Sequence, residues 1–167
     1  NKGIIDGTIA PVMVGSASTL MGITPLMDII ADSFPNPLDR KGEKDENGEE
    51  HKPDPNAPTS VFVFKTIADP FVGKMSFFKV MNGTLKKDMT LTNLESGVQE
   101  KFAHIYVVRG KKQIEVDELK CGDIGMTAKL TATNTNDTLG GDHKFDKVIF
   151  PTPYMKMAVV PVSYTHL

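Results

Sequence analysis

The sequence predicts a mainly β protein in which a closed antiparallel β-barrel follows a strand, a loop and a helix. Three observations support this prediction. After Thr59, about six short apolar segments are separated by Gly, Asn and Asp turns, as in small barrels. Residues 1–35 hold an apolar segment, a Gly-Ser turn and an amphipathic segment with helical spacing, which together are typical of the end of an α/β domain. A charged stretch without Ile, Val or aromatic residues separates the two parts.

Composition is ordinary for a globular domain. Of 167 residues, 40% are hydrophobic and 24% are charged, and the net charge is −2. No apolar run is long enough to span a bilayer, and the net charge gives no strong field toward nucleic acid or membrane. The single cysteine, Cys121, excludes an internal disulfide and fits a reducing compartment. We therefore expect no membrane partner.

Both ends of the chain are unusual. The first residue is Asn1 and no charged-then-apolar leader follows, so we expect a fragment of a longer protein. Residues 162–167, VSYTHL, interrupt a strand pattern and match the translation of a common sequencing-transposon end. We predict that these six residues are a non-native tail.

The first element, residues 9–17 (IAPVMVGSA), reads as a buried strand that enters a small-residue turn. In the next segment Thr24 is the expected N-cap and Pro25 the first helical residue. One face of this helix collects Ile23, Met27, Ile30 and Phe34, and the helix stops at Pro35 and Pro37. The loop Gly15, Ser16 and Ala17 could present backbone N–H groups to a flat ligand, although three small residues are equally typical of an ordinary strand-to-helix loop.

Residues 36–57 predict a solvated linker. Seven acids and four Lys or Arg residues occupy this stretch. Such a composition buries too little apolar surface to offset the entropy of ordering. An acidic binding tail is the alternative interpretation.

Residues 58–153 carry the barrel prediction. The segment 60–68 is apolar on both faces, and Asn82-Gly83 is a strong hairpin signal. Asp69-Pro70 with Gly73 predicts a tight bend. Further strands are expected in residues 89–93, 101–110, 112–116 and 123–130, with Ile124, Met126, Ala128 and Leu130 on one side of the last.

Motifs for chemistry are absent. No phosphate-binding loop occurs, and the four histidines have no cysteine pair to complete a metal site, so we expect neither a catalytic residue nor a metal. Arg109, Lys111 and Lys112 cluster at one turn. They could contact phosphates without reading bases, or form a solvated turn.

Several segments in order resemble elongation factor G, a family of translational GTPases. PVMVGSA…PLMDIIADSFPNP resembles the end of the GTPase domain, and KTIADPFVGKMSFFKV…NGTL with RGKKQIEVDEL…CGDIGMTAKL…TNDTL resembles the second domain. FPTPYMKMAVVP, residues 150–161, resembles the entry into the third domain. The likeness covers residues 9–161 and extends to paralogues of the main factor.

The resemblance implies a β-barrel of the translation-factor domain II type at residues 58–153 and the first strand of domain III at residues 154–161. It also implies a cytoplasmic parent that uses GTP and Mg²⁺ and drives translocation on the ribosome, with Gly15, Ser16 and Ala17 reading guanine. The barrel would pack on the GTPase domain and contact small-subunit rRNA, and Arg109, Lys111 and Lys112 are the candidate residues for that contact. This chain alone lacks the phosphate-binding loop, so we expect it to bind no cofactor and hydrolyse no GTP. A ribosome-protection or release-factor-type GTPase and a non-catalytic β-barrel binding module remain alternatives.

Overall fold

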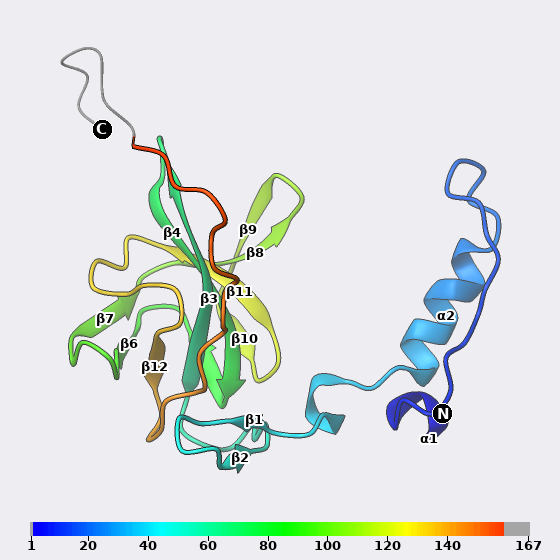
Figure 1. Cartoon of the computed structure of the whole chain (residues 1–167), viewed down its shortest axis with the longest axis horizontal. Coiled ribbons are helices and arrows are strands. Elements are labelled where there is room, and N and C mark those ends of the chain that lie inside the picture. The colour runs from blue at the N-terminus through cyan, green and yellow to red at the C-terminus, as the bar shows by residue number, and fades with distance from the viewer. Residues whose placement is uncertain (1, 159–167) are drawn as a thin grey trace.

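The protein is mainly β, as a computed structural model of residues 2–158 shows (Figure 1). Two α-helices, one 3-10 helix and strands β1 to β12 follow one another along the chain. Their bounds are α1 Lys2–Ile5, α2 Ile23–Ser33, η1 Pro37–Asp39, β1 Glu43–Lys44, β2 Glu50–His51, β3 Ser60–Asp69, β4 Gly73–Asn82, β5 Thr84–Lys86, β6 Met89–Thr92, β7 Gln99–Phe102, β8 Ile105–Arg109, β9 Lys112–Val116, β10 Glu118–Lys120, β11 Ile124–Ala128 and β12 Thr138–Gly140. No helix in the described part of the chain is long and apolar enough to cross a membrane.

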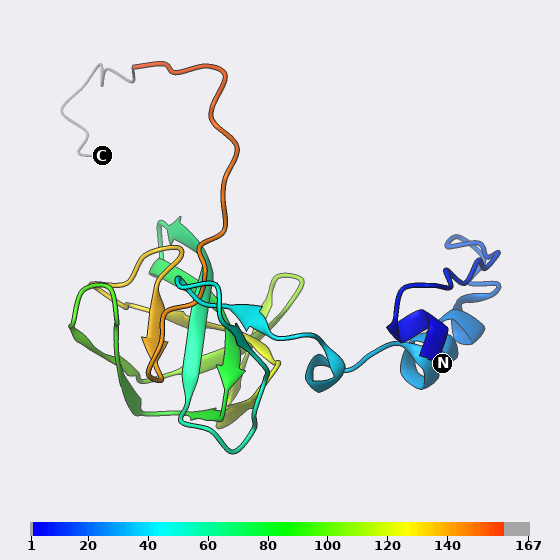
Figure 2. The same cartoon turned by 60° about the horizontal axis from the view of Figure 1, so that its bottom comes forward.

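All strand pairs are antiparallel. Six strands form one sheet in the order β12-β3-β4-β11-β8-β9, and three two-stranded ladders pair β5 with β10, β6 with β7 and β1 with β2 (Figure 2). An isolated bridge from Asn93 to Leu139 joins the β6–β7 ladder to β12. Within residues 2–158, no ladder joins β9 to β12, so the hydrogen bonds do not confirm the predicted closed barrel.

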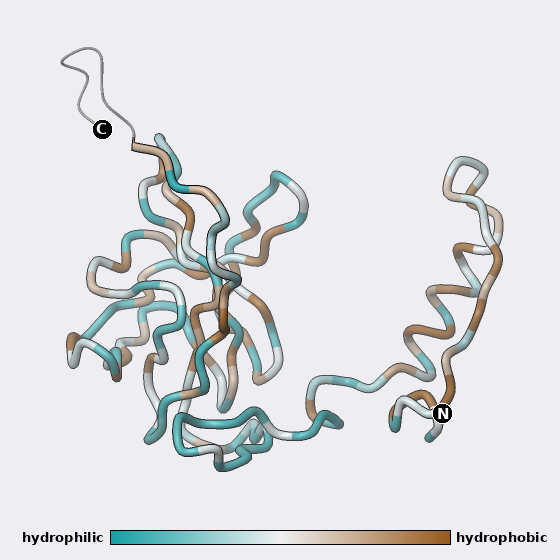
Figure 3. The backbone as a smooth tube through the Cα atoms, in the orientation of Figure 1, coloured by the Kyte–Doolittle hydropathy of each residue, from teal (hydrophilic) through white to brown (hydrophobic). Residues whose placement is uncertain are grey.

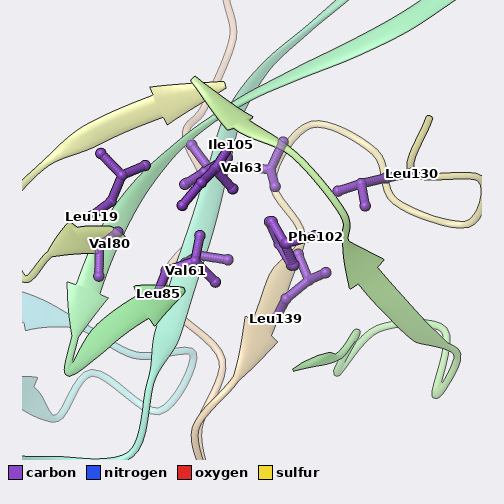
Figure 4. Close-up of a cluster of buried hydrophobic side chains, with 10 residues drawn as sticks. Val61, Val63, Val80, Leu85, Phe102, Ile105, Leu119, Leu130 and Leu139 are labelled. Carbon is purple, nitrogen blue, oxygen red and sulfur yellow. The ribbon is translucent and has the colours of Figure 1, made fainter. Parts of the chain in front are cut away.

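One apolar core lies between the large sheet and two of the small ladders (Figure 4). Its buried members come from seven strands and one connecting segment, and they are Val61, Val63, Phe78, Val80, Leu85, Phe102, Ile105, Leu119, Leu130 and Leu139. The rings of Phe78 and Phe102 meet edge to face, with centroids 5.5 Å apart. Burying each such side chain contributes about 1.5–3 kcal/mol, so this cluster is the main source of stability.

The turn between β3 and β4 forms as predicted. Asp69 Oδ1 accepts hydrogen bonds from the backbone N–H groups of Phe71 (2.9 Å) and Val72 (2.8 Å). Gly73 follows with φ +86°, a conformation that glycine adopts without strain. Asp69, Pro70 and Gly73 therefore shape a tight bend, as expected.

Two details of the predicted strands are wrong. Asn82-Gly83 does not close a hairpin, because β4 pairs with β3 and β11 whereas β5 pairs with β10. Gly83, with φ +68° and its N–H donated to the Asp54 carbonyl (2.9 Å), instead turns the chain from the large sheet into the small ladder. Ile124, predicted to share one side of its strand with Met126 and Leu130, is 59% exposed although those two are buried, because it stands at the first position of β11.

The N-terminal segment differs from the prediction as well. Residues 9–17 form no strand, and Val12 and Val14 are 91% and 92% exposed, because no neighbouring strand within residues 2–158 pairs with them. Figure 3 shows apolar residues along this exposed segment and along α2. The helix begins one residue before Thr24, its N-cap is Gly22 without a side-chain hydrogen bond, and Pro25 is the third helical residue.

The predicted helix face is also shifted. Ile23 and Phe34 of the predicted face line a groove against residues 11–15. Leu26 and Ile29 line it as well, in place of the exposed Met27 and Ile30. Since residues 9–17 run beside the helix instead of in a sheet, they select a different apolar face from the one the helical spacing suggested.

Residues 36–57 are not the solvated linker that their composition predicts. They contain η1 and the β1–β2 hairpin, whose turn Asn47-Gly48 follows the buried side chain of Asp45. Asp45 bridges to Phe145, and the carbonyl of Lys44 accepts a hydrogen bond from the Asp146 backbone N–H (2.8 Å). The hairpin is therefore held by residues about a hundred positions later in the chain. The composition of residues 36–57 could not predict these contacts.

The predicted first strand of domain III, residues 154–161, is described only in part. Residues 154–158 are exposed and form no strand, because no partner strand lies beside them in the described part. Residues 159–161 and the predicted non-native tail, residues 162–167, lie outside the described residues.

Candidate functional site

The β8–β9 hairpin carries the predicted cationic cluster. β8 and β9 pair in register from Ile105 with Val116 to Arg109 with Lys112, and Gly110 closes the turn with φ +60°. Arg109, Lys111 and Lys112 are all exposed, and none of them forms an ion pair within residues 2–158. The structure thus brings the three predicted residues together at one projecting tip (Figure 1).

This arrangement suits phosphate binding. A guanidinium can bridge two oxygens of one phosphate, while each lysine supplies a mobile point charge. Phosphate contacts of this kind fix the position of a protein on nucleic acid without reading its sequence. Residues 109–112 include no acid that could serve as an internal partner for these charges.

An acid at the base of the hairpin is already neutralised. The Glu115 carboxylate accepts hydrogen bonds from Lys87 Nζ (2.5 Å) and His104 Nδ1 (2.8 Å). The hydrogen bond from Lys87, followed by the one from His104, lowers the pKa of Glu115. The same contact with Glu115 raises the pKa of Lys87. Glu115 is therefore ionised and paired, and it does not cancel the charge of the tip.

The loop of Gly15, Ser16 and Ala17 lies between the apolar segment and α2. The Ser16 backbone N–H donates to the Met21 carbonyl (2.9 Å), and Ser16 Oγ accepts from the Thr19 backbone N–H (3.3 Å). These bonds occupy the Ser16 amide, which the sequence had offered as a free donor. A groove of about 240 Å³ begins at Gly15 and is lined mainly by apolar residues.

The two predicted sites are not brought together. The Gly15–Ala17 loop belongs to the N-terminal part, and the basic tip belongs to the β module (Figure 1). In this structure the guanine-loop residues and the basic-tip residues therefore do not form one site.

Sequence reasoning missed a polar cluster at the β1–β2 hairpin. The rings of His51 and His143 stack with centroids 3.6 Å apart and an interplanar angle of 13°. His51 Nε2 lies 3.1 Å from Asp45 Oδ2, and His143 Nδ1 lies 2.7 Å from Asp142 Oδ1. The only signal for it was Asn47-Gly48, a typical hairpin turn, inside a segment that otherwise looked solvated.

Asp45 is the central group of that cluster. Burial opposes its ionisation, but hydrogen bonds from His51 and from the backbone N–H groups of Glu49 and Asn47 outweigh burial and lower its pKa to about 2. Asp45, Glu49 and His51 each place a possible metal-ligand atom within 4.8 Å of the others. Both Asp45 oxygens already accept hydrogen bonds, so the present geometry gives the carboxylate a structural role in closing the hairpin.

Comparisons with known proteins agree with the fold. A crystal structure of a Thermus thermophilus protein superposes with a TM-score of 0.66 at 26% identity, covering 84% of this chain and 20% of that one. Elongation factor G of Thermotoga maritima is 36% identical over 97% of this chain, and that of Thermotoga neapolitana is 35% identical over the same share. The chain spans about a quarter of the length of these curated relatives.

The fold and the comparisons together indicate the class of protein. The fold and its relatives are those of a mainly β module from a translation elongation factor. The sequence model of the family "Elongation factor G domain 2" matches residues 58–142, which is half of the chain, and the chain belongs to that family.

Proposed function

We propose that the chain is part of a ribosomal translocation factor, a GTPase like elongation factor G, in which this β module packs on the GTPase domain and contacts small-subunit rRNA. The observation that carries the RNA contact is the exposed cationic tip of Arg109, Lys111 and Lys112, which forms no ion pair with the residues that the structure describes. Three exposed cations on one turn attract a polyanion more strongly than the nearly neutral chain as a whole.

Within this proposal the β module closes into a barrel. The β5–β10 and β6–β7 ladders supply Leu85, Leu119 and Phe102 to the same core that the large sheet covers. Register shifts in the β3–β4 ladder bend and twist those strands, which favours coiling of the sheet around the core. Closure would remove exposed strand edges that otherwise pair with other chains.

The organisation of the chain remains part of the proposal. We assign residues 1–35 to the end of the GTPase domain, 36–57 to a connecting segment, 58–153 to domain II and 154–161 to the start of domain III. The complete protein would act in the cytoplasm with GTP and Mg²⁺. Gly15, Ser16 and Ala17 would contact the guanine base, so a fluorescent guanine nucleotide should bind the complete protein and not this chain.

Charge reversal tests the RNA contact. In the complete protein, the triple change Arg109→Glu, Lys111→Glu and Lys112→Glu should weaken ribosome binding. The slope of log affinity against log salt concentration should fall by roughly 2–3, which is about 0.7–0.9 for each lost phosphate contact. Sedimentation with ribosomes over a salt series measures both quantities.

A matched control separates local from general charge effects. Lys41→Glu, Lys52→Glu and Lys120→Glu change the net charge by the same amount at exposed positions elsewhere. This control should leave the salt slope near that of the unchanged protein. Equal losses in both triple variants, or none in either, would return the tip to the role of a solvated turn.

A further inference from the structure

We propose that the tip of the β3–β4 hairpin is a second RNA contact, in which Phe71 stacks on an unpaired nucleobase while neighbouring lysines hold its phosphates. This proposal rests on the proposed function, because it takes RNA as the partner of the module. It adds a site that neither the basic tip nor the guanine loop includes.

Phe71 is presented in an unusual manner. Its side chain is 95% exposed, whereas the other phenylalanines of the β module are buried or half-buried within residues 58–145. The residue follows Pro70 at the apex of a hairpin that projects from the module (Figure 1). An aromatic ring in this position gains nothing for the fold, since it contacts no core residue.

The backbone beneath the ring is fixed before any partner binds. Asp69 Oδ1 accepts hydrogen bonds from the backbone N–H groups of Phe71 and Val72, and both residues lie at the apex. These two hydrogen bonds lower the pKa of Asp69. The carboxylate is thereby used inside the turn. A preorganised apex loses little conformational entropy when its aromatic side chain docks, which favours binding.

Two lysines lie near this apex, on its β4 side. Lys74 follows the turn on β4, and the Lys129 backbone N–H donates to its carbonyl (3.0 Å), which places the two lysines side by side. Lys129 is exposed, whereas Lys74 is half-exposed and its Nζ donates to the Asn134 side-chain oxygen at 3.2 Å. An exposed aromatic ring beside lysines is an arrangement that suits single-stranded nucleic acid, with the ring stacking on a base and the cations following the backbone.

The two hairpins meet close to their tips. Gln113 Nε2 of β9 donates to Met75 Sδ of β4 at 3.7 Å, so the β8–β9 hairpin lies against the start of β4. An RNA segment held at the basic tip therefore has its neighbouring nucleotides near the β3–β4 hairpin. The charge complementarity favours RNA over an apolar protein pocket as the occupant of this apex.

The chain contains no tryptophan, which provides a direct test. Phe71→Trp places a single indole at the apex of the 167-residue chain. A short single-stranded oligoadenylate should quench its fluorescence in a saturable manner, since stacked adenine quenches indole. Ile124→Trp, at another exposed position of the module, is the matched control and should show no saturable quenching.

Affinity measurements supply the second arm. Phe71→Ala and Phe71→Leu should both weaken binding of the labelled oligoadenylate by about fivefold to 150-fold, because stacking on one base is worth about 1–3 kcal/mol. Phe71→Tyr should retain most of the affinity. An RNA duplex of the same length should bind more weakly, since its bases are already stacked. Because Phe71 is solvent-exposed, these three variants and Phe71→Trp should all keep the unfolding midpoint of the unchanged chain.

The outcomes separate this inference from the proposed function. Unquenched Phe71→Trp together with unchanged affinity of Phe71→Ala overturns the stacking site, even if charge reversal at the basic tip weakens ribosome binding. The stacking site is also overturned if Phe71→Tyr loses as much affinity for the oligoadenylate as Phe71→Ala does. It is overturned as well if Phe71→Ala impairs only assembly with the GTPase domain. Saturable quenching alongside an ineffective charge reversal would retain the stacking site and reject the basic tip.

Discussion

Replacement of Asn93 by alanine should destabilise the β module more than any other single change to a polar side chain in it. Asn93 is fully buried and connects two loops, the one between β6 and β7 and the one between β11 and β12. Its Nδ2 donates to Asp137 Oδ2 (2.8 Å), and its Oδ1 accepts from the backbone N–H groups of Glu95 (2.8 Å) and Ser96 (3.1 Å). Alanine would leave the buried Asp137 carboxylate without this donor and two turn amides without an acceptor.

The magnitude follows from these contacts. A hydrogen bond to a charged group contributes about 1.5–3 kcal/mol and each neutral one about 1 kcal/mol. The sum predicts a loss of roughly 3–5 kcal/mol in the free energy of unfolding. With a urea m-value of about 2 kcal/mol/M, the unfolding midpoint should fall by roughly 2 M.

Equilibrium unfolding in urea, followed by circular dichroism, measures this loss. Asn56→Ala is the control, since that exposed side chain should change the stability by less than about 0.5 kcal/mol. Asn93→Asp sharpens the test, because it keeps the acceptor for the turn but places a second carboxylate beside Asp137. At neutral pH this variant should be at least as unstable as Asn93→Ala, and it should recover partly in acid. A loss below about 1 kcal/mol for Asn93→Ala would refute the reasoning.

Two further predictions concern the turn at Gly83 and the β1–β2 hairpin. Gly83→Ala should cost about 1–3 kcal/mol more than Gly110→Ala in urea unfolding, because both glycines have positive φ but only at Gly83 would the new Cβ meet a backbone atom, 2.6 Å from the Ala57 carbonyl oxygen. Equal losses would show that the close approach is unimportant. For Asp45, a folded pKa of about 2 against an ordinary 3.8 means that its stabilisation is present above pH 3.8 and is lost as the pH falls toward 2. The protection of the Asn47 and Glu49 amides against hydrogen exchange, relative to an unstructured peptide at the same pH, should therefore fall over that window because Asp45 accepts both N–H groups; in Asp45→Asn this protection should be low at every pH.

The strands of the β module could be predicted because their signals are local. Segments such as Met89–Thr92 alternate between half-buried and exposed residues, and Lys112–Val116 follows a glycine turn that pairs it with β8. The bend at Asp69 and Gly73 could be predicted equally well, since its hydrogen bonds join residues two and three positions apart. The clustering of Arg109, Lys111 and Lys112 needed only adjacency in sequence.

The remaining features depend on partners far along the chain. The β1–β2 hairpin is ordered by Phe145 and by stacking of His51 on His143, and composition carries no trace of either contact. The Asn82-Gly83 signal was real as a turn, but the identity of the strand that follows it is decided by pairing with β10. The segment 9–17 has the composition of a strand, but within residues 2–158 it has no strand to pair with.

The ordered state of residues 36–57 changes how the N-terminal part is connected. A freely jointed segment of that length would span roughly 25 Å on average and would let its two ends move independently. Pro37 instead packs on Gly122, where an added Cβ would lie only 2.3 Å from the proline ring, and the Asp54 carbonyl accepts the Gly83 amide.

Because both ends of this stretch are pinned to the β module, the joint between α2 and that module is confined to residues 34–36. Rotation of the helix would act as a lever on the β10–β11 turn against which Pro37 rests. A movement of α2 would therefore be transmitted to the β module, because no flexible segment of 22 residues separates the two.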